Sequence, residues 1–299
     1  FILPNGVDIN NLIENLKIFS WKSADILINY SERMRDLNFK NEVLEATDKN
    51  DPVTVADLEV NKLIVSSIQK IYPNIDWQFL TEENVKRGSN PLNSCSDWLW
   101  ILDPLDGTKD FIQGTGNYAM HLALTYKQKS YIGFVLIPER DELWIANGQK
   151  ICCVRRDRSL LGTNLSNKHN LNEMVLVTSK NHKNEMLTRL IEKINFKDVI
   201  EMGSVGCKIA SILRGESDIY ISLSIPGQSS PKDWDFAAPA TILKAAGGAV
   251  TNLNNEELTY GESNYEKCGI IIASNDRKNH RNICLKVKEI IKVNNIYPL

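Results

Sequence analysis

Residues 98–108 read Trp-Leu-Trp-Ile-Leu-Asp-Pro-Leu-Asp-Gly-Thr, an apolar run followed by two carboxylates, a glycine and a threonine. The apolar run predicts a buried strand that ends on Asp103 and Asp106. Two carboxylates at a strand end suit hard divalent cations such as magnesium. Gly107 lets the backbone approach a ligand closely, and the N–H groups that follow it could hold an anion. Carboxylates for a metal beside amides for a phosphate indicate phosphate-ester chemistry.

The composition is that of an ordinary globular protein of one large domain or two smaller ones, with 299 residues and 42% hydrophobic residues. The formal net charge of -2 argues against a polyanion-binding protein, so no nucleic-acid polymer is expected as a partner. No apolar run is long enough to span a membrane, and residues 1–6 lack the features of a signal peptide. The start at Phe1 suggests a trimmed N-terminus. The six cysteines lack paired CxxC spacing, which predicts buried reduced thiols and a cytoplasmic enzyme without a zinc site.

Apolar periodicity predicts an α+β first half and a βαβ-type second half. The first half is expected to hold a helix over 12–30, a second helix that begins near Thr54, and an antiparallel sheet from strands at 118–125, 131–137, 142–146 and 150–154. The second helix should bury a stripe formed by Val60, Leu63, Ile64, Ile68 and Ile71. A polar linker at 162–172 divides the chain into domains 1–172 and 173–299. The second domain should contain strands at 174–178, 218–222 and 269–273 and helices at 184–194, 208–213, 236–246 and 277–293.

Acidic residues recur at four places beside predicted elements. Besides the pair after the apolar run, they are Asp51, which precedes the second helix, Glu82, which follows Phe79-Leu80, and Asp235, which opens a helix. Carboxylates gathered without partners repel one another and raise one another's pKa, so a cluster of them requires cations. One rival chemistry is excluded by spacing. The haloacid-dehalogenase phosphatases use Asp-x-Asp-Gly, whereas two residues separate the aspartates here.

These motifs resemble the lithium-sensitive, magnesium-dependent phosphatases of the inositol monophosphatase superfamily. The matching segments, in the family's order, are Asp51-Pro-Val-Thr-Val-Ala-Asp57, Glu82-Glu83, Trp100 to Thr108, Trp234-Asp-Phe-Ala-Ala238 and Ala246-Gly-Gly248. The resemblance implies a layered αβαβα sandwich with an N-terminal α+β and a C-terminal α/β subdomain. It also implies two to three Mg²⁺ ions, replaceable by Mn²⁺, with inhibition by Li⁺ and Ca²⁺.

Residue roles follow from the same resemblance. The implied metal ligands are Glu82, Asp103, the backbone carbonyl of Leu105, Asp106 and Asp235. Gly107 and Thr108 would hold the phosphate through backbone N–H groups. Thr108, hydrogen-bonded to Asp51, would orient and help deprotonate a metal-bound water, while Glu82 would also hold a third, weaker ion.

Within the superfamily, three segments resemble the CysQ-type 3'(2'),5'-bisphosphate nucleotidases. They are Asp106-Gly-Thr-Lys-Asp-Phe111, Ser179-Lys-Asn-His182 and Gly203-Ser204-x-x-x-Lys208. In that interpretation Lys208 pairs with the 5'-phosphate, His182 lies beside adenine, and Gly203, Ser204 and Asp235 contact the substrate. The expected reaction removes the 3'-phosphate from 3'-phosphoadenosine 5'-phosphate, which would link the enzyme to sulfur metabolism.

Several alternatives remain open. No arginine stands near Tyr220, where this branch often has one, although Lys232 could replace it. Asp51 lies three residues before Thr54, which is the spacing of inositol monophosphatases. The nucleotidases usually carry this acid five residues before the threonine, where Lys49 stands in this chain. Another acid could therefore be the general base. An inositol-1-phosphate or sugar-phosphate phosphatase is therefore the alternative enzyme, and a catalytically idle phosphate-binding homologue is a third. The partner is expected to be a small phosphorylated metabolite, and the protein a monomer or homodimer.

Overall fold

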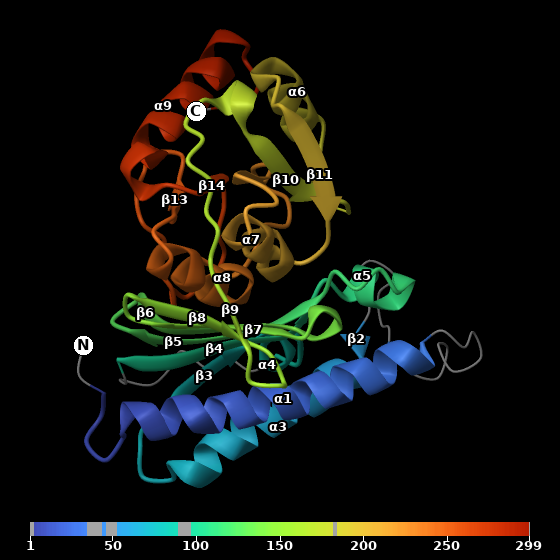
Figure 1. The fold of residues 1–299 in the computed structure, drawn as a ribbon, viewed down its shortest axis with the longest axis vertical. Coiled ribbons are helices and arrows are strands. Elements are labelled where there is room, and N and C mark those ends of the chain that lie inside the picture. The colour runs from blue at the N-terminus through green and yellow to red at the C-terminus, as the bar shows by residue number, and fades with distance from the viewer. Residues whose placement is uncertain (1–2, 35–43, 46–52, 89–96, 182–183, 299) are drawn as a thin grey trace.

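The computed structural model describes residues 3–34, 44–45, 53–88, 97–181 and 184–298. Within them, helices and sheets stack in five layers, in the order helix, sheet, helix, sheet, helix (Figure 1). The αβαβα sandwich that the motifs imply is thereby confirmed. Asp51 and His182 lie outside the described residues, so their expected roles stay predictions.

The first layer consists of α1 (Ile9–Arg33) and α3 (Val55–Ile71), which confirm the two helices predicted for this region. Asp8 caps α1, because its carboxylate accepts a hydrogen bond from the N–H of Asn11 at 2.9 Å. The buried stripe of α3 is narrower than predicted. Leu63 is only half-buried, and Ile71 at the end of the helix is exposed.

The second layer is a seven-stranded sheet in the order β3-β4-β5-β6-β7-β8-β9. Its strands are β3 (Gln78–Thr81), β4 (Trp98–Asp106), β5 (Ala119–Tyr126), β6 (Lys129–Ile137), β7 (Glu142–Asn147), β8 (Lys150–Val154) and β9 (Leu160–Leu161). All neighbours are antiparallel except β3 and β4, which run parallel. The antiparallel sheet predicted from 118–154 is confirmed. The short elements around it are α4 (Glu82–Lys86), α5 (Thr108–Gln113), a 3₁₀ turn (Pro138–Arg140) and a ribbon of β1 (Leu44–Glu45) and β2 (Val53–Thr54).

Burial on both faces explains why the start of β4 is continuously apolar. Leu99 and Ile101 belong to the core between the two sheets, while Trp100 and Leu102 belong to the core beneath α1 and α3. Because successive side chains of a strand point to opposite faces, a strand covered on both sides needs apolar residues at every position.

The two faces of the neighbouring strand β5 differ in side-chain size. Met120, Leu122 and Leu124 face α1 and α3, whereas Ala119 and Ala123 face the middle layer. The small residues let a helix approach the sheet closely. On β6, a Cβ added at Gly133 would lie 2.9 Å from Cβ of Thr241, which shows how tightly α8 is packed there.

The middle layer consists of α7 (Val205–Leu213) and α8 (Asp233–Ala245), and the outer layer of α6 (Glu185–Ile194) and α9 (Arg277–Val293). Between them lies a five-stranded sheet in the order β11-β10-β12-β14-β13. Its strands are β10 (Val175–Ser179), β11 (Asp198–Met202), β12 (Ile219–Leu223), β13 (Ala249–Asn252) and β14 (Ile270–Ser274). β10 is parallel to β11 and β12, but β14 is antiparallel to β12 and β13.

This second half differs from the sequence prediction in several ways. The βαβ-type arrangement holds for β10 with β11 and β12, whereas β14 is antiparallel to both of its neighbours, and β11 and β13 were not anticipated. Helix α7 begins at Val205 rather than Lys208, because the Ser204 hydroxyl caps it by accepting the N–H of Cys207 at 3.2 Å. Helix α8 begins at Asp233 rather than Phe236, so that Asp235 lies in its first turn, whereas the C-terminal helix, α9, has the predicted bounds.

Residues 162–170 contain no helix or strand and connect the two sheets, followed by a 3₁₀ turn (Leu171–Glu173). The buried carboxylate of Asp218 anchors this connection. It accepts hydrogen bonds from the ammonium of Lys168 at 3.0 Å and from the N–H of Val175 at 2.7 Å. The domain division at residue 172 stays a prediction. Helices α7 and α8, which belong to the second half of the chain, cover one face of the first sheet.

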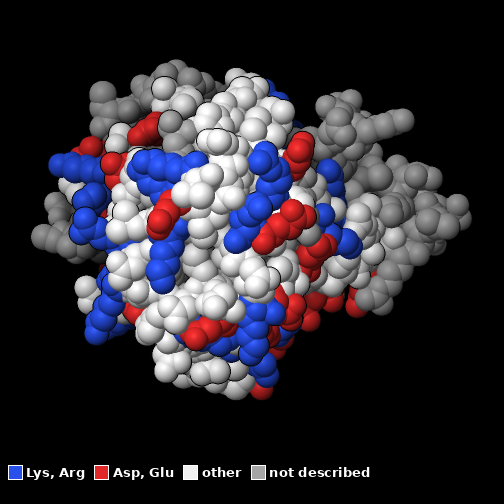
Figure 2. Space-filling view, turned by 90° about the horizontal axis from the view of Figure 1, so that it is seen from above, with Lys and Arg blue, Asp and Glu red and all other residues white. Residues whose placement is uncertain are grey.

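In the described part of the chain, no helix is both long enough and apolar enough to cross a membrane. On the face formed by the outer helices, basic and acidic side chains are intermixed (Figure 2). The expectation of buried thiols is confirmed for Cys153, Cys207 and Cys284 and wrong for Cys268, which is exposed. Cys152 is half-buried, on the face of β8 opposite to Cys153, and Cys95 lies outside the described residues.

His280 joins the outer helix layer to the second sheet. Its side chain is 1% exposed, with Nδ1 2.6 Å from Oγ of Ser274 and Nε2 2.8 Å from Oγ1 of Thr251. Burial lowers the pKa of His280 from 6.5 to about 4. The imidazole is therefore neutral in the folded protein at pH values where the unfolded chain already carries a proton on it.

This difference predicts a loss of stability in mild acid. Between pH 6.5 and 4 the unfolded chain binds a proton at His280 and the folded chain does not, so stability falls as the pH falls, by up to about 3 kcal/mol from this residue. His280→Leu should be less stable near pH 7, because it loses two buried hydrogen bonds, but its stability should decline less over that pH range. Urea unfolding at a series of pH values measures both, and equal slopes for the two proteins would contradict the prediction.

Candidate metal and phosphate site

The parallel pairing of β3 with β4 brings the first two acids together. Thr81 pairs with Leu102, so the next residues, Glu82 and Asp103, lie at the same edge. Thr81 ends β3 and caps α4, because its hydroxyl accepts the N–H of Asn84 at 3.1 Å. The segment Thr81-Glu82-Glu83-Asn84 is therefore a strand end followed directly by a helix start.

The second aspartate follows an irregularity in β4. The register with β5 shifts between Asp103 and Asp106, and a carboxylate oxygen of Asp103 accepts the N–H of Leu105 at 3.1 Å. The Thr108 hydroxyl donates to the carbonyl of Leu105 at 3.1 Å. This is the carbonyl expected to bind a metal ion, and a carbonyl oxygen has two lone pairs, so the bond leaves one for a cation.

Asp235 comes from the first turn of α8, whose start is held from two sides. One carboxylate oxygen of Asp235 accepts the N–H of Lys232 at 2.6 Å. The buried carboxylate of Asp233 pairs with the ammonium of Lys267 at 2.5 Å and accepts the N–H of Gly261 at 2.6 Å. Lys232 itself pairs with Glu266 at 2.6 Å.

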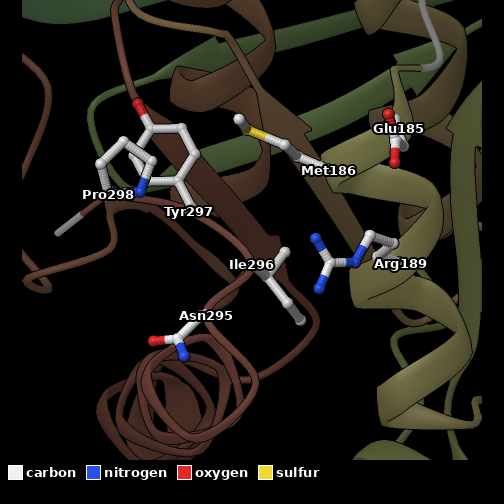
Figure 3. Close-up of a pocket in the computed structure, with 7 residues that line it drawn as sticks. All are labelled: Glu185, Met186, Arg189, Asn295, Ile296, Tyr297 and Pro298. Atoms are coloured by element: carbon white, nitrogen blue, oxygen red, sulfur yellow. The ribbon is translucent and has the colours of Figure 1, made fainter.

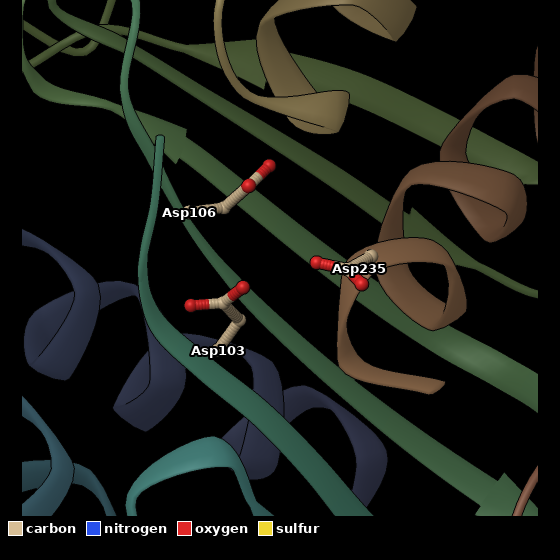
Figure 4. Close-up of side chains that lie close together, drawn as sticks. All are labelled: Asp103, Asp106 and Asp235. Atoms are coloured by element: carbon tan, nitrogen blue, oxygen red, sulfur yellow. The ribbon is translucent and has the colours of Figure 1, made fainter. Parts of the chain in front are cut away.

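Three carboxylates converge in space, two from one strand and the third from a helix far along the chain (Figure 4). Asp103, Asp106 and Asp235 each have a carboxylate oxygen within 4.8 Å of those of the other two. Asp103 and Asp106 project from β4 and Asp235 from α8, so the cluster lies between the first sheet and the middle helix layer. The sequence predicted that acids from four segments converge, and the structure brings together the acids of two of them, the Asp103–Asp106 segment and the Asp235 segment. Glu82 adjoins the cluster, and Asp51 lies outside the described residues.

The cluster is electrostatically unfavourable without a cation. Burial and the charges of Glu82, Asp106 and Asp235 raise the pKa of Asp103 well above its usual value. Burial and the charge of Asp106 raise the pKa of Asp235 in the same way. A divalent ion would remove this cost, because carboxylate oxygens at these separations match the ligands that Mg²⁺ prefers. The residues present therefore fit the predicted metal.

Two glycines let the second half of the chain approach the cluster. Gly107 has φ +88° and caps α5, and a Cβ there would lie 2.8 Å from the carbonyl of Asn117 and 3.1 Å from N of Ser204. A Cβ at Gly203 would lie 2.2 Å from a carboxylate oxygen of Asp110. The segments at Gly107 and at Gly203-Ser204, both predicted to bind substrate, are therefore in direct contact.

The carboxylate of Asp110, which is fully buried, connects these segments to the end of β10. It accepts hydrogen bonds from the Thr115 hydroxyl at 2.7 Å and from the Asn181 amide at 2.9 Å. Since β10 and β11 are parallel and paired up to Ser179 and Met202, the residues that follow both strands lie side by side.

Lys208 is 3% exposed, within α7. Its ammonium donates to the carbonyl of Ser204 at 3.2 Å and lies 5.2 Å from the centre of the Tyr220 ring. Burial lowers its pKa, while the charges of Asp106, Asp110 and Asp235 act in the opposite direction. Its pairing with a substrate phosphate stays a prediction.

Sequence reasoning missed His121, which lies on β5 opposite Asp103 and is 3.4 Å from a carboxylate oxygen of Asp106. The sequence feature that could have pointed to it is a histidine, one of four in the chain, in the middle of an apolar strand.

A cavity of about 350 Å³ lies elsewhere, between α6 and the C-terminal segment (Figure 3). It is lined by residues such as Met186, Arg189 and Tyr297, in the outermost layer of the sandwich. None of the acidic ligands lines it.

Comparison with known proteins agrees with this site. The model of the inositol monophosphatase family matches residues 15–292. The chain belongs to the inositol monophosphatase family. The prediction made from the motifs is confirmed, and the family is one of phosphatases that generally depend on Mg²⁺.

Two relatives of this family member have different names at the same identity. "Nus factor SuhB" of Pasteurella multocida is 30% identical over 268 residues, which cover 86% of this chain and 88% of the relative. "3'(2'),5'-bisphosphate nucleotidase CysQ" of Buchnera aphidicola is 30% identical over 216 residues, which cover 72% and 76%. The two names do not separate the possible substrates.

Among solved structures, the IMPase of Thermotoga maritima shares the fold. Its TM-score is 0.72 at 24% identity, and the match covers 95% of this chain and 99% of that one.

The cluster predicts that metal binding stabilises this phosphatase-family protein. At a Mg²⁺ concentration of about a hundred times Kd, binding adds about 2.7 kcal/mol to the free energy of unfolding. Asp103→Asn should abolish this gain, and its metal-free form should be at least as stable as the metal-free wild type because one repulsive charge is gone. Thermal unfolding with Mg²⁺ and with EDTA measures both effects.

The control is Asp157→Asn, which changes an exposed acid and should respond to Mg²⁺ as the wild type does. If Asp103→Asn also gains full stability from Mg²⁺, the ion binds somewhere else.

Proposed function

We propose that the protein is a Mg²⁺-dependent phosphomonoesterase whose reaction takes place at the Asp103–Asp106–Asp235 cluster. The convergence of these three carboxylates is the observation that carries the proposal. The intact ligand set also argues against a catalytically idle homologue, since each predicted acidic metal ligand is present.

The chain's own residues would divide the work as follows. Asp103, Asp106 and Asp235 would hold the ions, with Glu82 beside them and the carbonyl of Leu105 as a further ligand. When bound, the ions would supply charge for the phosphate oxygens and lower the pKa of a water. Backbone N–H groups in the first turn of α5, directly after Asp106, would donate to the phosphate. Orientation of the attacking water by Thr108 with Asp51 rests on the family resemblance alone.

We further propose 3'-phosphoadenosine 5'-phosphate as the substrate, losing its 3'-phosphate to give AMP. The support is that the segments resembling the nucleotidase branch are in contact. Gly107 touches Ser204, and Asp110 touches Gly203 and binds Asn181, the residue before His182. A ligand with two phosphates could span these segments. Lys232, considered as a replacement for the missing arginine, has its ammonium paired with Glu266.

A substrate panel tests this proposal. With Mg²⁺ present, phosphate release should be fastest, by kcat/KM, for 3'-phosphoadenosine 5'-phosphate, compared with inositol 1-phosphate and fructose 1,6-bisphosphate. We expect a preference of at least about tenfold, which corresponds to about 1.4 kcal/mol of additional transition-state binding. AMP, which lacks the 3'-phosphate, is the matched control and should release little phosphate.

A preference for inositol 1-phosphate would overturn the nucleotide assignment and favour the alternative enzyme, without touching the metal-dependent chemistry. No hydrolysis of any phosphate monoester, with Mg²⁺ bound, would overturn both.

A further inference from the structure

His121 occupies the point where three elements of the site meet. It lies on β5 between Met120 and Leu122, whose side chains face α1 and α3. Because side chains alternate along a strand, the imidazole faces the other way, toward α7 and α8. It is 1% exposed.

The contacts of the ring define its protonation. Nδ1 lies 3.2 Å from the carbonyl oxygen of Trp234, which can only accept, so Nδ1 carries the hydrogen. Nε2 lies 3.1 Å from the backbone N of Gly206, whose N–H can only donate, so Nε2 accepts. This neutral tautomer satisfies both helices at once.

Gly206 shows how close the approach is. A Cβ at this position would lie 2.3 Å from Nε2 of His121 and 2.8 Å from a methyl carbon of Val135. The ring therefore fills the space that a side chain at Gly206 would need, and the backbone of α7 is held directly against it.

Each backbone partner of the ring is adjacent in sequence to a residue of the proposed metal site or to a residue that binds one. Trp234 immediately precedes Asp235. Gly206 immediately follows Val205, whose N–H donates to a carboxylate oxygen of Asp106. That carboxylate lies 3.4 Å from Nε2. The ring, which lies on β5, thus contacts the Asp106 carboxylate of β4 and the turn of α8 that carries Asp235.

We propose that His121 is a positioning residue, which sets the separation of the Asp106 and Asp235 carboxylates so that they can share one divalent cation. The inference rests on the proposed function, because it concerns the metal ions of the same site. The ring acts on the metal site through its contact with the Asp106 carboxylate and through the backbone of α7 and α8.

The test is Mn²⁺ binding to the full-length, metal-free protein, followed by electron paramagnetic resonance and calorimetry. His121→Leu removes both hydrogen bonds and should weaken the Mn²⁺ affinity of the site formed by Asp106 and Asp235 by about 10- to 100-fold, as loss of a residue that orients metal ligands does. His280→Leu is the matched control. It also removes a buried histidine with two hydrogen bonds, but one that lies among Thr251, Ser274 and α9.

Two conservative variants separate the contacts and remain informative if His121→Leu does not fold. His121→Asn places an amide near the position of Nδ1 and can keep the bond to Trp234, while His121→Gln can reach toward the N–H of Gly206. Each should restore part of the Mn²⁺ affinity. A purely structural role would instead lower the melting temperature of the His121 and His280 variants alike and leave their Mn²⁺ affinities equal to that of the wild type.

The outcomes separate the two proposals. Equal Mn²⁺ affinity in wild type and all folded His121 variants overturns the positioning role and leaves the proposed function intact. A wild type that binds no Mn²⁺ overturns the metal site itself, and with it both proposals.

Discussion

The repulsion among three carboxylates, of which Asp103 is buried and Asp106 and Asp235 are half-buried, is the constraint around which this structure is organised. Asp103, Asp106 and Asp235 hold oxygen atoms within 4.8 Å of one another, and the pKa values of Asp103 and Asp235 are raised. Left to themselves, such groups would move apart or take up protons. The fold must therefore keep them together by forces that act elsewhere, namely the packing of α8 on the first sheet and the hydrogen bonds of the backbone around each acid.

These forces come from elements that belong to different parts of the chain. Pairing of β3 with β4 places Glu82 beside Asp103, and a bulge in β4 turns Asp106 toward the same space. Small residues on β5 and β6 let α8 approach, and the buried pair of Asp233 and Lys267 fixes the beginning of that helix. The geometry of the cluster thus depends on strand pairing and helix packing as well as on the acids themselves.

Local patterns in the sequence were sufficient for the features that depend on neighbours in the chain. The apolar run before Asp103 predicted β4, and the order of the acidic motifs predicted both the family and the layered fold. Features that depend on distant contacts were missed. β11 contains charged residues at both Asp198 and Glu201, so its pattern is not that of a buried strand, and β13 is only four residues long. Burial of Lys208 and the position of His121 result from packing of α7 against β5, which no local pattern contains.

The placement of α8 has a consequence for how the two halves of the polypeptide depend on each other. By sequence this helix belongs to the C-terminal half, but its apolar side covers β4, β5 and β6 of the N-terminal half. A fragment ending in the 162–170 connection would leave that sheet face open to water, including Leu99, Ile101 and the alanines of β5. The remaining fragment would retain Asp235 on a helix that has lost its contacts with β4, β5 and β6. Each half therefore relies on the other to bury this apolar surface, and a protease cut between them should yield complementing fragments rather than independent modules.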